Sequence, residues 1–242
     1  MARMLAAEGT DLVVVARDTE RLDALAREIA ESGSSVSVEV LGADLALPDQ
    51  LLSVEARLAD PERPIDLLVN NAGFGTYGDF TTLPVDGEER EIRVNVVALV
   101  RLAHAALVPM RERGSGTVLN VASVAGLQAT PNNATYGATK AFVASFSEAL
   151  HEENRGTGVH VSMVLPGFTR TEFQERAGIE GRKIPSIAWM DVDVCARQAL
   201  DAARDNKPFF VPGILNKTMA AVTGTLPRNV TRSVAARLSR RL

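Results

Sequence analysis

The sequence predicts a doubly wound α/β fold, in which helices cover both faces of a parallel sheet and form three layers with it. Short runs rich in valine, leucine and isoleucine alternate with longer stretches that have helical spacing. The runs are apolar along their whole length, as strands are when both faces of their sheet are covered. Strands that alternate with helices are joined by right-handed crossovers, which place the strands parallel to one another.

The expected elements follow one another in a regular order. Residues 11–16 (DLVVVA) form the first expected strand, and the alanine-rich helix after it ends near Gly33. Residues 1–9 have a helical pattern that ends at Gly9, so we expect the strand that usually opens such a sheet to be absent. Further strands are expected at 34–40, 65–70, 116–123 and 158–166, with helices near 50–59, 88–110, 134–154 and 192–204.

Length and composition indicate one principal domain. At 242 residues and 46% hydrophobic content, the chain can bury one substantial core. We expect an α/β domain over residues 1–212 and a C-terminal amphipathic helical extension over 213–242. The net charge of -4 argues against a nucleic-acid-binding protein, which usually carries a basic surface. We find neither an apolar stretch of membrane-spanning length nor a signal peptide, so we expect a cytoplasmic location.

Three side chains are candidates for a catalytic cluster. Tyr136 and Lys140 are four residues apart on an expected helix, so they project from the same face. Ser123 follows an expected strand, at the carboxyl end where such sheets bind their ligands. These residues alone are weak evidence, because many helices carry a tyrosine and a lysine at this spacing and a serine often caps a turn.

Further motifs make the pattern specific. The segment NNAG (70–73) ends one expected strand, Asn95 lies within the following helix, and a Pro-Gly pair (166–167) ends a later strand. Together with the serine and the YxxxK pair, these motifs occur in the order typical of the short-chain dehydrogenase/reductase family, which the chain resembles over nearly its whole length. The resemblance implies a Rossmann-like sheet. It also implies an oxidoreductase that transfers hydride between a nicotinamide cofactor and a carbonyl compound or secondary alcohol.

The resemblance implies a catalytic tetrad of Asn95, Ser123, Tyr136 and Lys140. A carbonyl that accepts hydride develops negative charge on oxygen, which Tyr136 would protonate and Ser123 would stabilise. We expect the Lys140 ammonium to lower the pKa of the phenol toward neutrality and, by analogy with the family, to bind the ribose hydroxyls. Asn95 would hold a water in a proton path; without the resemblance, an exposed polar residue is an equal interpretation.

The residue after the first expected strand indicates the cofactor. An acidic residue there binds a free ribose 2′-hydroxyl, whereas an arginine pairs with a 2′-phosphate. Arg17 comes first and Asp18 is expected to cap the next helix, which favours NADP(H) over NAD(H). Asp44 resembles the family residue that binds adenine, and a turn-forming aspartate explains it equally well. The expected cofactor contacts are Arg17, Asp44, Leu45, Asn71, Ala72, Gly73, Tyr136, Lys140, Pro166, Gly167, Thr169 and Thr171.

One glycine string is not the phosphate-binding turn. Gly73, Gly75 and Gly78 spell G-x-G-x-x-G after a strand, but turn-forming residues follow instead of a helix. We therefore expect a loop whose small residues let the cofactor approach the backbone. The family's TGxxxGxG turn does not occur in the sequence, so by family comparison we expect about twenty residues upstream of Met1. We also expect the chain as printed to be unstable or poor in cofactor.

Two later segments bear on the substrate. Residues 173–190 are expected to form a lid, and its isoleucines together with Trp189 and Met190 favour a hydrophobic substrate. After a short expected strand at 208–212, the tail combines an apolar stripe with five arginines between Arg228 and Leu242. This pattern suits packing over the substrate cleft, which we favour, or contact with a membrane surface.

These observations favour an NADP(H)-dependent oxidoreductase that acts on a hydrophobic carbonyl compound or secondary alcohol, without a metal site. The alternatives are a non-catalytic nucleotide-binding or scaffold protein and an inactive fragment from a misassigned start. The presence of all four tetrad residues favours the enzyme. The resemblance further implies a homodimer or homotetramer assembled through the two long helices.

Overall fold

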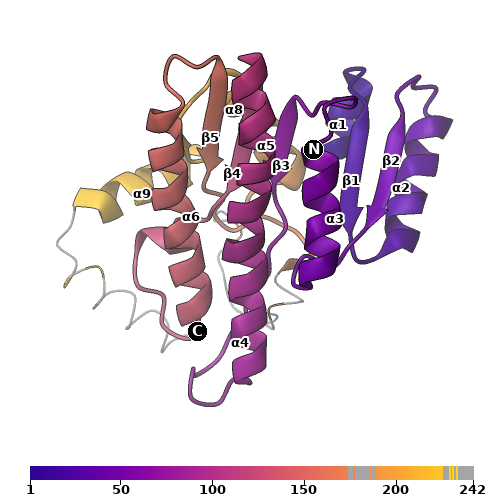
Figure 1. Cartoon of the computed structure of the whole chain (residues 1–242). Helices are drawn as coiled ribbons and strands as arrows, with labels where there is room; N and C mark the ends of the chain where they lie inside the picture. The colour runs from indigo at the N-terminus through magenta and orange to yellow at the C-terminus, as the bar shows by residue number, and fades with distance from the viewer. Residues whose placement is uncertain are drawn as a thin grey trace.

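The computed structural model describes residues 1–173, 177, 186, 189–225, 229, 231 and 233. All described strands are parallel, and they form two sheets that lie next to each other in Figure 1. In the smaller sheet, β1 (Leu12–Ala16) pairs with β2 (Val38–Gly42). The larger sheet has the order β3 (Leu67–Asn70), β4 (Gly116–Val121), β5 (Val159–Val164) and β6 (Phe209–Phe210). The predicted α/β fold class is confirmed.

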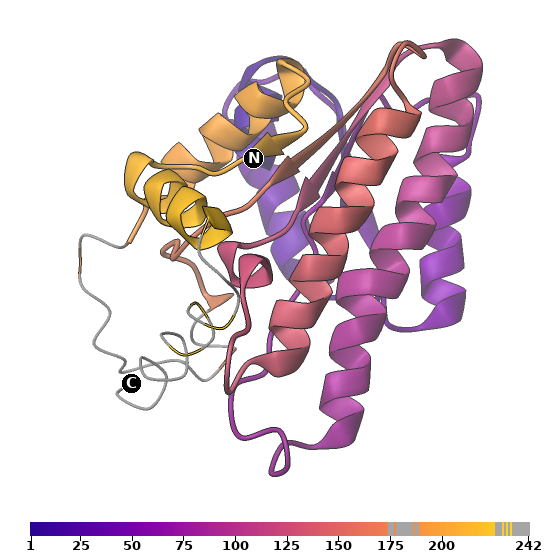
Figure 2. The same ribbon diagram turned by 90° about the vertical axis from the view of Figure 1, so that its left-hand side faces the viewer.

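Helices cover both faces of the sheets, as Figure 2 shows. Consecutive residues of β4 demonstrate the three layers, because Val118 packs toward the helices of one face and Leu119 toward those of the other, and both are fully buried. This two-sided burial explains why the strands are apolar along their whole length. One face carries α3 (Pro48–Leu58), α5 (Leu99–Arg113) and α6 (Ala134–Glu153); the other carries α1 (Ala2–Ala7), α2 (Thr19–Glu31) and α8 (Val192–Arg204).

Helix α1 connects the two sheets. Among the described residues, β1 and β3 each pair with a strand on one side only, so the sheet is interrupted between them. Leu5 of α1 packs against the apolar clusters of both parts. Glu8, at the end of α1, pairs with Arg197 of α8 at 2.6 Å, and Arg3 pairs with Glu28 of α2 at 2.6 Å. Because exposed ion pairs contribute little stability, the apolar contacts of α1 are the main connection.

The long helix expected at 88–110 is not uniform. α4 (Val85–Ile92) passes into a π-helical segment, Arg93–Ala98, before α5 begins. By length and composition the run Val85–Arg113, which contains an 18-residue window with a mean hydropathy of 1.5, is long and apolar enough to cross a membrane. This corrects the expectation that no such stretch exists. Within the fold, the run packs on the sheet through Leu102, Ala106 and other buried core residues.

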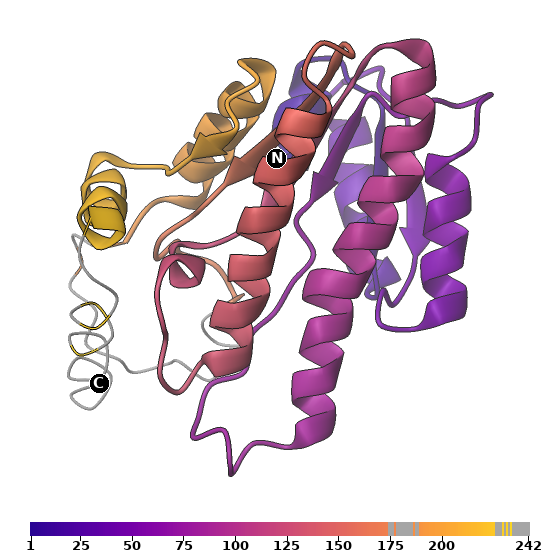
Figure 3. The same cartoon turned by 60° about the vertical axis from the view of Figure 1, so that its left-hand side comes forward.

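The C-terminal part is described only as far as α9 (Ile214–Thr225), apart from residues 229, 231 and 233. Figure 3 shows α9 beside the short helix η2 (Val124–Leu127), and Ala220 packs against the core cluster that contains Leu99 and Val143. The short strand expected at 208–212 is observed as β6. The predicted apolar stripe beyond Thr225 lies outside the described residues.

A buried polar network ties α6 to the centre of the larger sheet. Asn70, at the end of β3, donates from Nδ2 to Oδ1 of Asn120 on β4 at 3.0 Å. Asn120 in turn donates to the Ser147 hydroxyl on α6 at 2.9 Å, and that hydroxyl donates to the Val143 carbonyl at 2.7 Å. All three polar side chains are buried, so their hydrogen bonds replace those they would make to water.

The substitution Asn120→Ala tests this network. It leaves the Asn70 amide without its acceptor and opens a cavity, so we expect the free energy of unfolding to fall by about 2 kcal/mol. Urea unfolding measures the change. Ser53→Ala is the matched control, since the Ser53 hydroxyl bonds to the Gln50 carbonyl at the exposed surface of α3. Equal stability of the two variants would contradict the role assigned to the network.

Candidate active site

The four predicted tetrad residues come together at the carboxyl end of β4. Ser123 follows β4 and caps η2, where its hydroxyl accepts a hydrogen bond from the Ala125 amide at 3.1 Å. Tyr136 and Lys140 lie one turn apart on α6, and Asn95 lies in the π-helical segment. Parallel strands end at the same edge of a sheet, which is why residues far apart in the sequence meet here.

Tyr136 is enclosed by its neighbours. Its side chain forms a hydrogen bond with the Ser123 side chain. The ring of Phe173 lies against the ring of Tyr136, with centroids 5.3 Å apart. On another side, the backbone of Gly75 is so close that a Cβ at that position would lie 2.9 Å from Tyr136 Cδ2. The hydroxyl of Tyr136 is therefore held beside that of Ser123 by packing on its ring.

The structure corrects the expected pKa of Tyr136. Burial raises this pKa to about 12, the hydrogen bond with Ser123 lowers it, and the charge of Glu91 raises it further. The Nζ of Lys140 lies 5.7 Å from the centroid of the Tyr136 ring and is directed to the Val121 carbonyl. The phenol accordingly remains protonated at neutral pH.

Lys140 is buried, and its ammonium donates a hydrogen bond to the carbonyl of Val121 at 2.7 Å. Burial lowers the pKa of Lys140 to about 8, and the nearby carboxylate of Glu91 raises it. An ammonium has three donors, and among the described residues the Val121 carbonyl is its one hydrogen-bond acceptor. The other donors remain available for the hydroxyl groups of a ligand.

Asn95 is 1% exposed, which excludes the alternative of an exposed polar residue. Its amide spans the loop that follows β3: Oδ1 accepts from the Phe74 amide at 3.1 Å, and Nδ2 donates to the Phe74 carbonyl at 2.8 Å. Nδ2 also donates to the Thr139 hydroxyl on α6 at 3.1 Å. Asn95 thus joins the 73–76 loop to the helix that carries Tyr136 and Lys140, and π-helical turns of this kind often occur at functional sites.

Two of the three glycines of the rejected string, Gly73 and Gly75, lie against catalytic side chains. A Cβ at Gly73 would lie 3.0 Å from Oδ1 of Asn95 and 3.5 Å from Nζ of Lys140, and Gly75 packs on Tyr136. No helix begins at this string, since α4 starts only at Val85. The absence of side chains here lets the backbone approach the tetrad. Asn71 and Ala72, two predicted cofactor contacts, are exposed in the same loop.

The residues expected to bind the adenosine end of a cofactor lie at the ends of β1 and β2. Arg17 is exposed after β1, and the Asp18 carboxylate accepts a hydrogen bond from the Arg21 amide at 3.0 Å as the cap of α2. Asp44 accepts from the Ala46 amide at 3.0 Å, as a turn-forming aspartate does, and pairs with Arg90. Burial raises the pKa of Asp44, but these hydrogen bonds lower it more, so the carboxylate stays charged.

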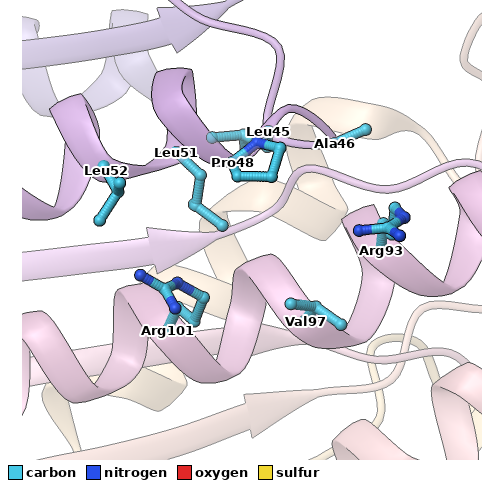
Figure 4. A pocket seen from close by; sticks show the side chains of 8 residues that line it. All are labelled: Leu45, Ala46, Pro48, Leu51, Leu52, Arg93, Val97 and Arg101. Atoms are coloured by element: carbon cyan, nitrogen blue, oxygen red, sulfur yellow. The ribbon is translucent and has the colours of Figure 1, made fainter.

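Leu45 lines a pocket between α3 and the helix formed by the π-helical segment and α5, which Figure 4 shows. Leu51 and Val97 supply apolar surface to this pocket, and Arg93 and Arg101 lie at its edge. None of the four tetrad residues lines it. This pocket therefore does not support the expected contact between Leu45 and a cofactor, because it lies between helices and includes no catalytic residue.

The Pro-Gly turn lies beside η2 and α9. The Pro166 carbonyl accepts from the Val124 amide at 3.1 Å, and the side chain of Asn216 on α9 occupies the space that a Cβ at Gly167 would need. Thr169 donates from its hydroxyl to the Gly167 carbonyl at 3.2 Å, and the Thr171 hydroxyl accepts from the Phe173 amide at 3.2 Å.

Only part of the predicted lid is described. Thr169 forms a β-bridge with Met190, and the rings of Phe168 and Trp189 lie 5.7 Å apart. Phe173 and Ala177 are also described. The lid isoleucines Ile179, Ile184 and Ile187 lie outside the described residues.

Sequence reasoning missed two acidic residues on α4. Glu88 and Glu91 are 5% and 0% exposed, and both accept hydrogen bonds from the Thr76 hydroxyl, at 2.5 and 3.0 Å. Glutamates in a charged helical stretch are normally exposed. The sequence feature that could have indicated the burial of Glu91 is its spacing of four residues from Asn95, which places both side chains on one helix face.

Comparison with known proteins defines the class. The family model described as short chain dehydrogenase matches residues 1–180. The chain belongs to the short-chain dehydrogenase/reductase family. It is therefore an oxidoreductase of carbonyl or alcohol substrates that uses a nicotinamide cofactor.

Three proteins illustrate the similarity. The ketoacyl reductase HetN from Nostoc sp. is 30% identical over 242 residues, 96% of this chain and 82% of that protein. A short-chain dehydrogenase from Sphingobium yanoikuyae, solved in complex with NADPH, is 37% identical with a TM-score of 0.83, covering 94% of this chain and 91% of that one. The bulky-bulky ketone specific alcohol dehydrogenase from Comamonas testosteroni is 31% identical with a TM-score of 0.78, covering 94% and 89%.

The substitution Gly75→Ala tests the packing on Tyr136. The added methyl group must displace the ring, so we expect kcat for carbonyl reduction to fall by about tenfold to a hundredfold with the fold retained. Initial rates with a panel of carbonyl compounds measure this. Gly87→Ala on α4 is the control, because nothing lies within 4 Å of its Cβ position. Unchanged turnover in Gly75→Ala would contradict the packing argument.

Proposed function

We propose that the protein is an NADP(H)-dependent reductase or dehydrogenase that interconverts a hydrophobic carbonyl compound and its secondary alcohol. The observation that carries the proposal is the position of the Tyr136 and Ser123 hydroxyls beside each other, next to a buried ammonium with free donors. A site that protonates and stabilises a developing alkoxide requires these groups.

The residues present fit the nicotinamide end of the cofactor. The free donors of Lys140 suit the ribose hydroxyls, and Gly73 leaves room for a ligand to approach the backbone next to that ammonium. Pro166 and Thr169 follow β5 at the edge of the sheet where such ligands bind. The residues assigned here hold the nicotinamide and adenosine ends, and the sequence contains no TGxxxGxG turn for the pyrophosphate.

Arg17 supports the choice of NADP(H). It is exposed at the end of β1, while the neighbouring Asp18 is engaged as the cap of α2 and is less available to a ribose hydroxyl. An arginine is suited to pair with a phosphate through two hydrogen bonds. The similar Sphingobium yanoikuyae structure was solved with NADPH, which agrees with this choice.

The mechanism assigns one task to each tetrad residue. The bound nicotinamide would supply hydride to the carbonyl carbon. Tyr136, a phenol that is protonated at neutral pH, donates its proton to the carbonyl oxygen, and the Ser123 hydroxyl donates a hydrogen bond to the same oxygen. Lys140 holds the ribose, and Asn95 keeps the 73–76 loop against α6.

The surroundings of Tyr136 favour an apolar substrate. Phe173 lies on the Tyr136 ring, and Phe168, Trp189 and Met190 lie along the segment that follows β5. Sites lined by aromatic side chains bind apolar ligands with a few placed polar groups. The similarity to a bulky-bulky ketone specific alcohol dehydrogenase is consistent with a bulky substrate.

Assembly as a homodimer or homotetramer belongs to the same proposal. Val108 on α5 and Phe142 on α6 are 45% and 42% exposed on the outer faces of the two long helices. Exposed apolar side chains on neighbouring helices suit an interface between copies.

The substitution Tyr136→Phe tests the proton donor. It removes the hydroxyl and keeps the ring, so we expect kcat to fall by about three orders of magnitude. Tyr77→Phe is the matched control, because Tyr77 is the only other tyrosine of the sequence. Reduction of a carbonyl panel followed by NADPH absorbance measures both variants. Comparable turnover of Tyr136→Phe and the unaltered protein would refute the assignment.

The substitution Arg17→Ala tests the cofactor preference. Without the guanidinium, we expect KM for NADPH to rise by about tenfold while KM for NADH stays the same. Arg27→Ala, at an exposed position on α2, serves as the control. If the ratio of the two KM values were the same in Arg17→Ala and the unaltered protein, Arg17 would not contact the 2′-phosphate.

A further inference from the structure

Glu91 is a buried carboxyl group that the tetrad does not include. It is 0% exposed and lies on α4, one helical turn before Asn95. We propose that Glu91 is a positioning residue of the active site, which provides a buried counter-charge for the Lys140 ammonium and holds the 73–76 loop against the tetrad. Its effect on turnover rests on the proposed function, whereas its effect on Lys140 does not.

Glu91 and Asn95 hold the same loop at two points. Oε2 of Glu91 accepts hydrogen bonds from the Thr76 amide at 2.9 Å and from the Thr76 hydroxyl at 3.0 Å. Asn95 binds both backbone groups of Phe74. Between these anchors and Lys140 lies Gly73, whose Cβ position is 3.5 Å from Nζ. The helix face that carries Glu91 and Asn95 therefore fixes the backbone that borders the ammonium.

The second oxygen of Glu91 remains unpaired. Oε1 is buried and accepts no hydrogen bond from any residue that the structure describes. A buried carboxylate without a partner for each oxygen is unfavourable unless a positive charge compensates it. The charged and titratable groups that act on Glu91 or respond to it are Glu88 on its own helix and Lys140 and Tyr136 on α6. Lys140 is the only cation among them.

The two charges depend on each other. Burial raises the pKa of Glu91 to about 7, and the charge of Lys140 lowers it. Burial lowers the pKa of Lys140 to about 8, and the charge of Glu91 raises it. Above pH 7 the ionised carboxylate therefore opposes loss of the proton from Lys140. Glu89 on the same helix is exposed and pairs with Arg93 at 2.7 Å, so it is the control for loss of a carboxylate outside the site.

The experiment measures the Lys140 titration directly. The sequence contains four lysines, so ¹³C-labelled lysine gives few side-chain resonances, and Lys140→Arg assigns the one from Lys140. We expect Glu91→Gln, which keeps an acceptor for Thr76 but removes the charge, to lower the titration midpoint of Lys140 by about one pH unit. Glu89→Gln should leave that midpoint unchanged. An equal midpoint in Glu91→Gln and the unaltered protein overturns the proposal.

The pH dependence of stability provides a second test of the buried Glu91 carboxylate. Because the folded-state pKa of Glu91 lies above its ordinary value of 4.5, the stability it contributes is present below pH 4.5 and is lost as pH rises through about 7. The stability of Glu91→Gln relative to the unaltered protein should therefore increase over this range, and a difference independent of pH contradicts the proposal. Should Glu91→Gln not fold, Glu91→Met, which keeps the volume without charge, replaces it in both measurements.

The outcomes separate the two proposals. If no variant reduces a carbonyl compound but the Lys140 midpoint falls in Glu91→Gln, the counter-charge stands and the proposed function fails. If turnover depends on Tyr136 but the Lys140 midpoint does not respond to Glu91, the proposed function stands and this inference fails. If both hold, the alkaline limb of kcat/KM moves to lower pH in Glu91→Gln and not in Glu89→Gln.

Discussion

The enclosure of the Lys140 ammonium is the constraint on which the rest of the site depends. A buried amine tends to lose its proton, and two features oppose this here: the Val121 carbonyl and the carboxylate of Glu91. The same enclosure keeps Tyr136 protonated, because a phenolate would be more costly in this environment than a phenol. Lys140 can therefore remain a cation and Tyr136 a proton donor, next to each other, near neutral pH.

The fold provides this environment through its backbone rather than through long side chains. The Val121 carbonyl lies at the end of β4, and Ser123 follows that strand. Tyr136 and Lys140 project from one face of α6. Asn95, in the π-helical segment, hydrogen-bonds to the loop after β3. That loop contains Gly73 and Gly75, whose missing side chains allow close packing on the tetrad. The buried Asn70, Asn120 and Ser147 network then fixes α6 relative to the strands.

Patterns of apolar residues predicted most of the architecture. The helix expected at 192–204 has those bounds in the structure, and the strands agree to within a few residues, because burial on both faces requires continuous apolar runs. The tetrad residues could be identified because their order and spacing are specific. Helical periodicity could not reveal the π-helical turn at Asn95 or the connection of the two sheets by α1, since both depend on contacts between segments distant in the sequence.

Charge interactions were the least predictable part. We expected the pKa of Tyr136 to be lowered toward neutrality, whereas burial raises it to about 12, and the Lys140 ammonium is directed at the Val121 carbonyl. Glu91 was missed because its burial arises from the loop that folds over α4. Such effects depend on desolvation, which is set by the packed structure.

The central claim is that one substrate oxygen meets the Tyr136 and Ser123 hydroxyls while the Lys140 ammonium faces the ribose. A crystal structure of the complex with NADP⁺ and a carbonyl-containing inhibitor tests this most directly. The account predicts that the inhibitor oxygen lies within hydrogen-bond distance of both hydroxyls and that Nζ of Lys140 contacts the ribose hydroxyls. An inhibitor oxygen that contacts neither hydroxyl, or an ammonium turned away from the cofactor, would contradict it.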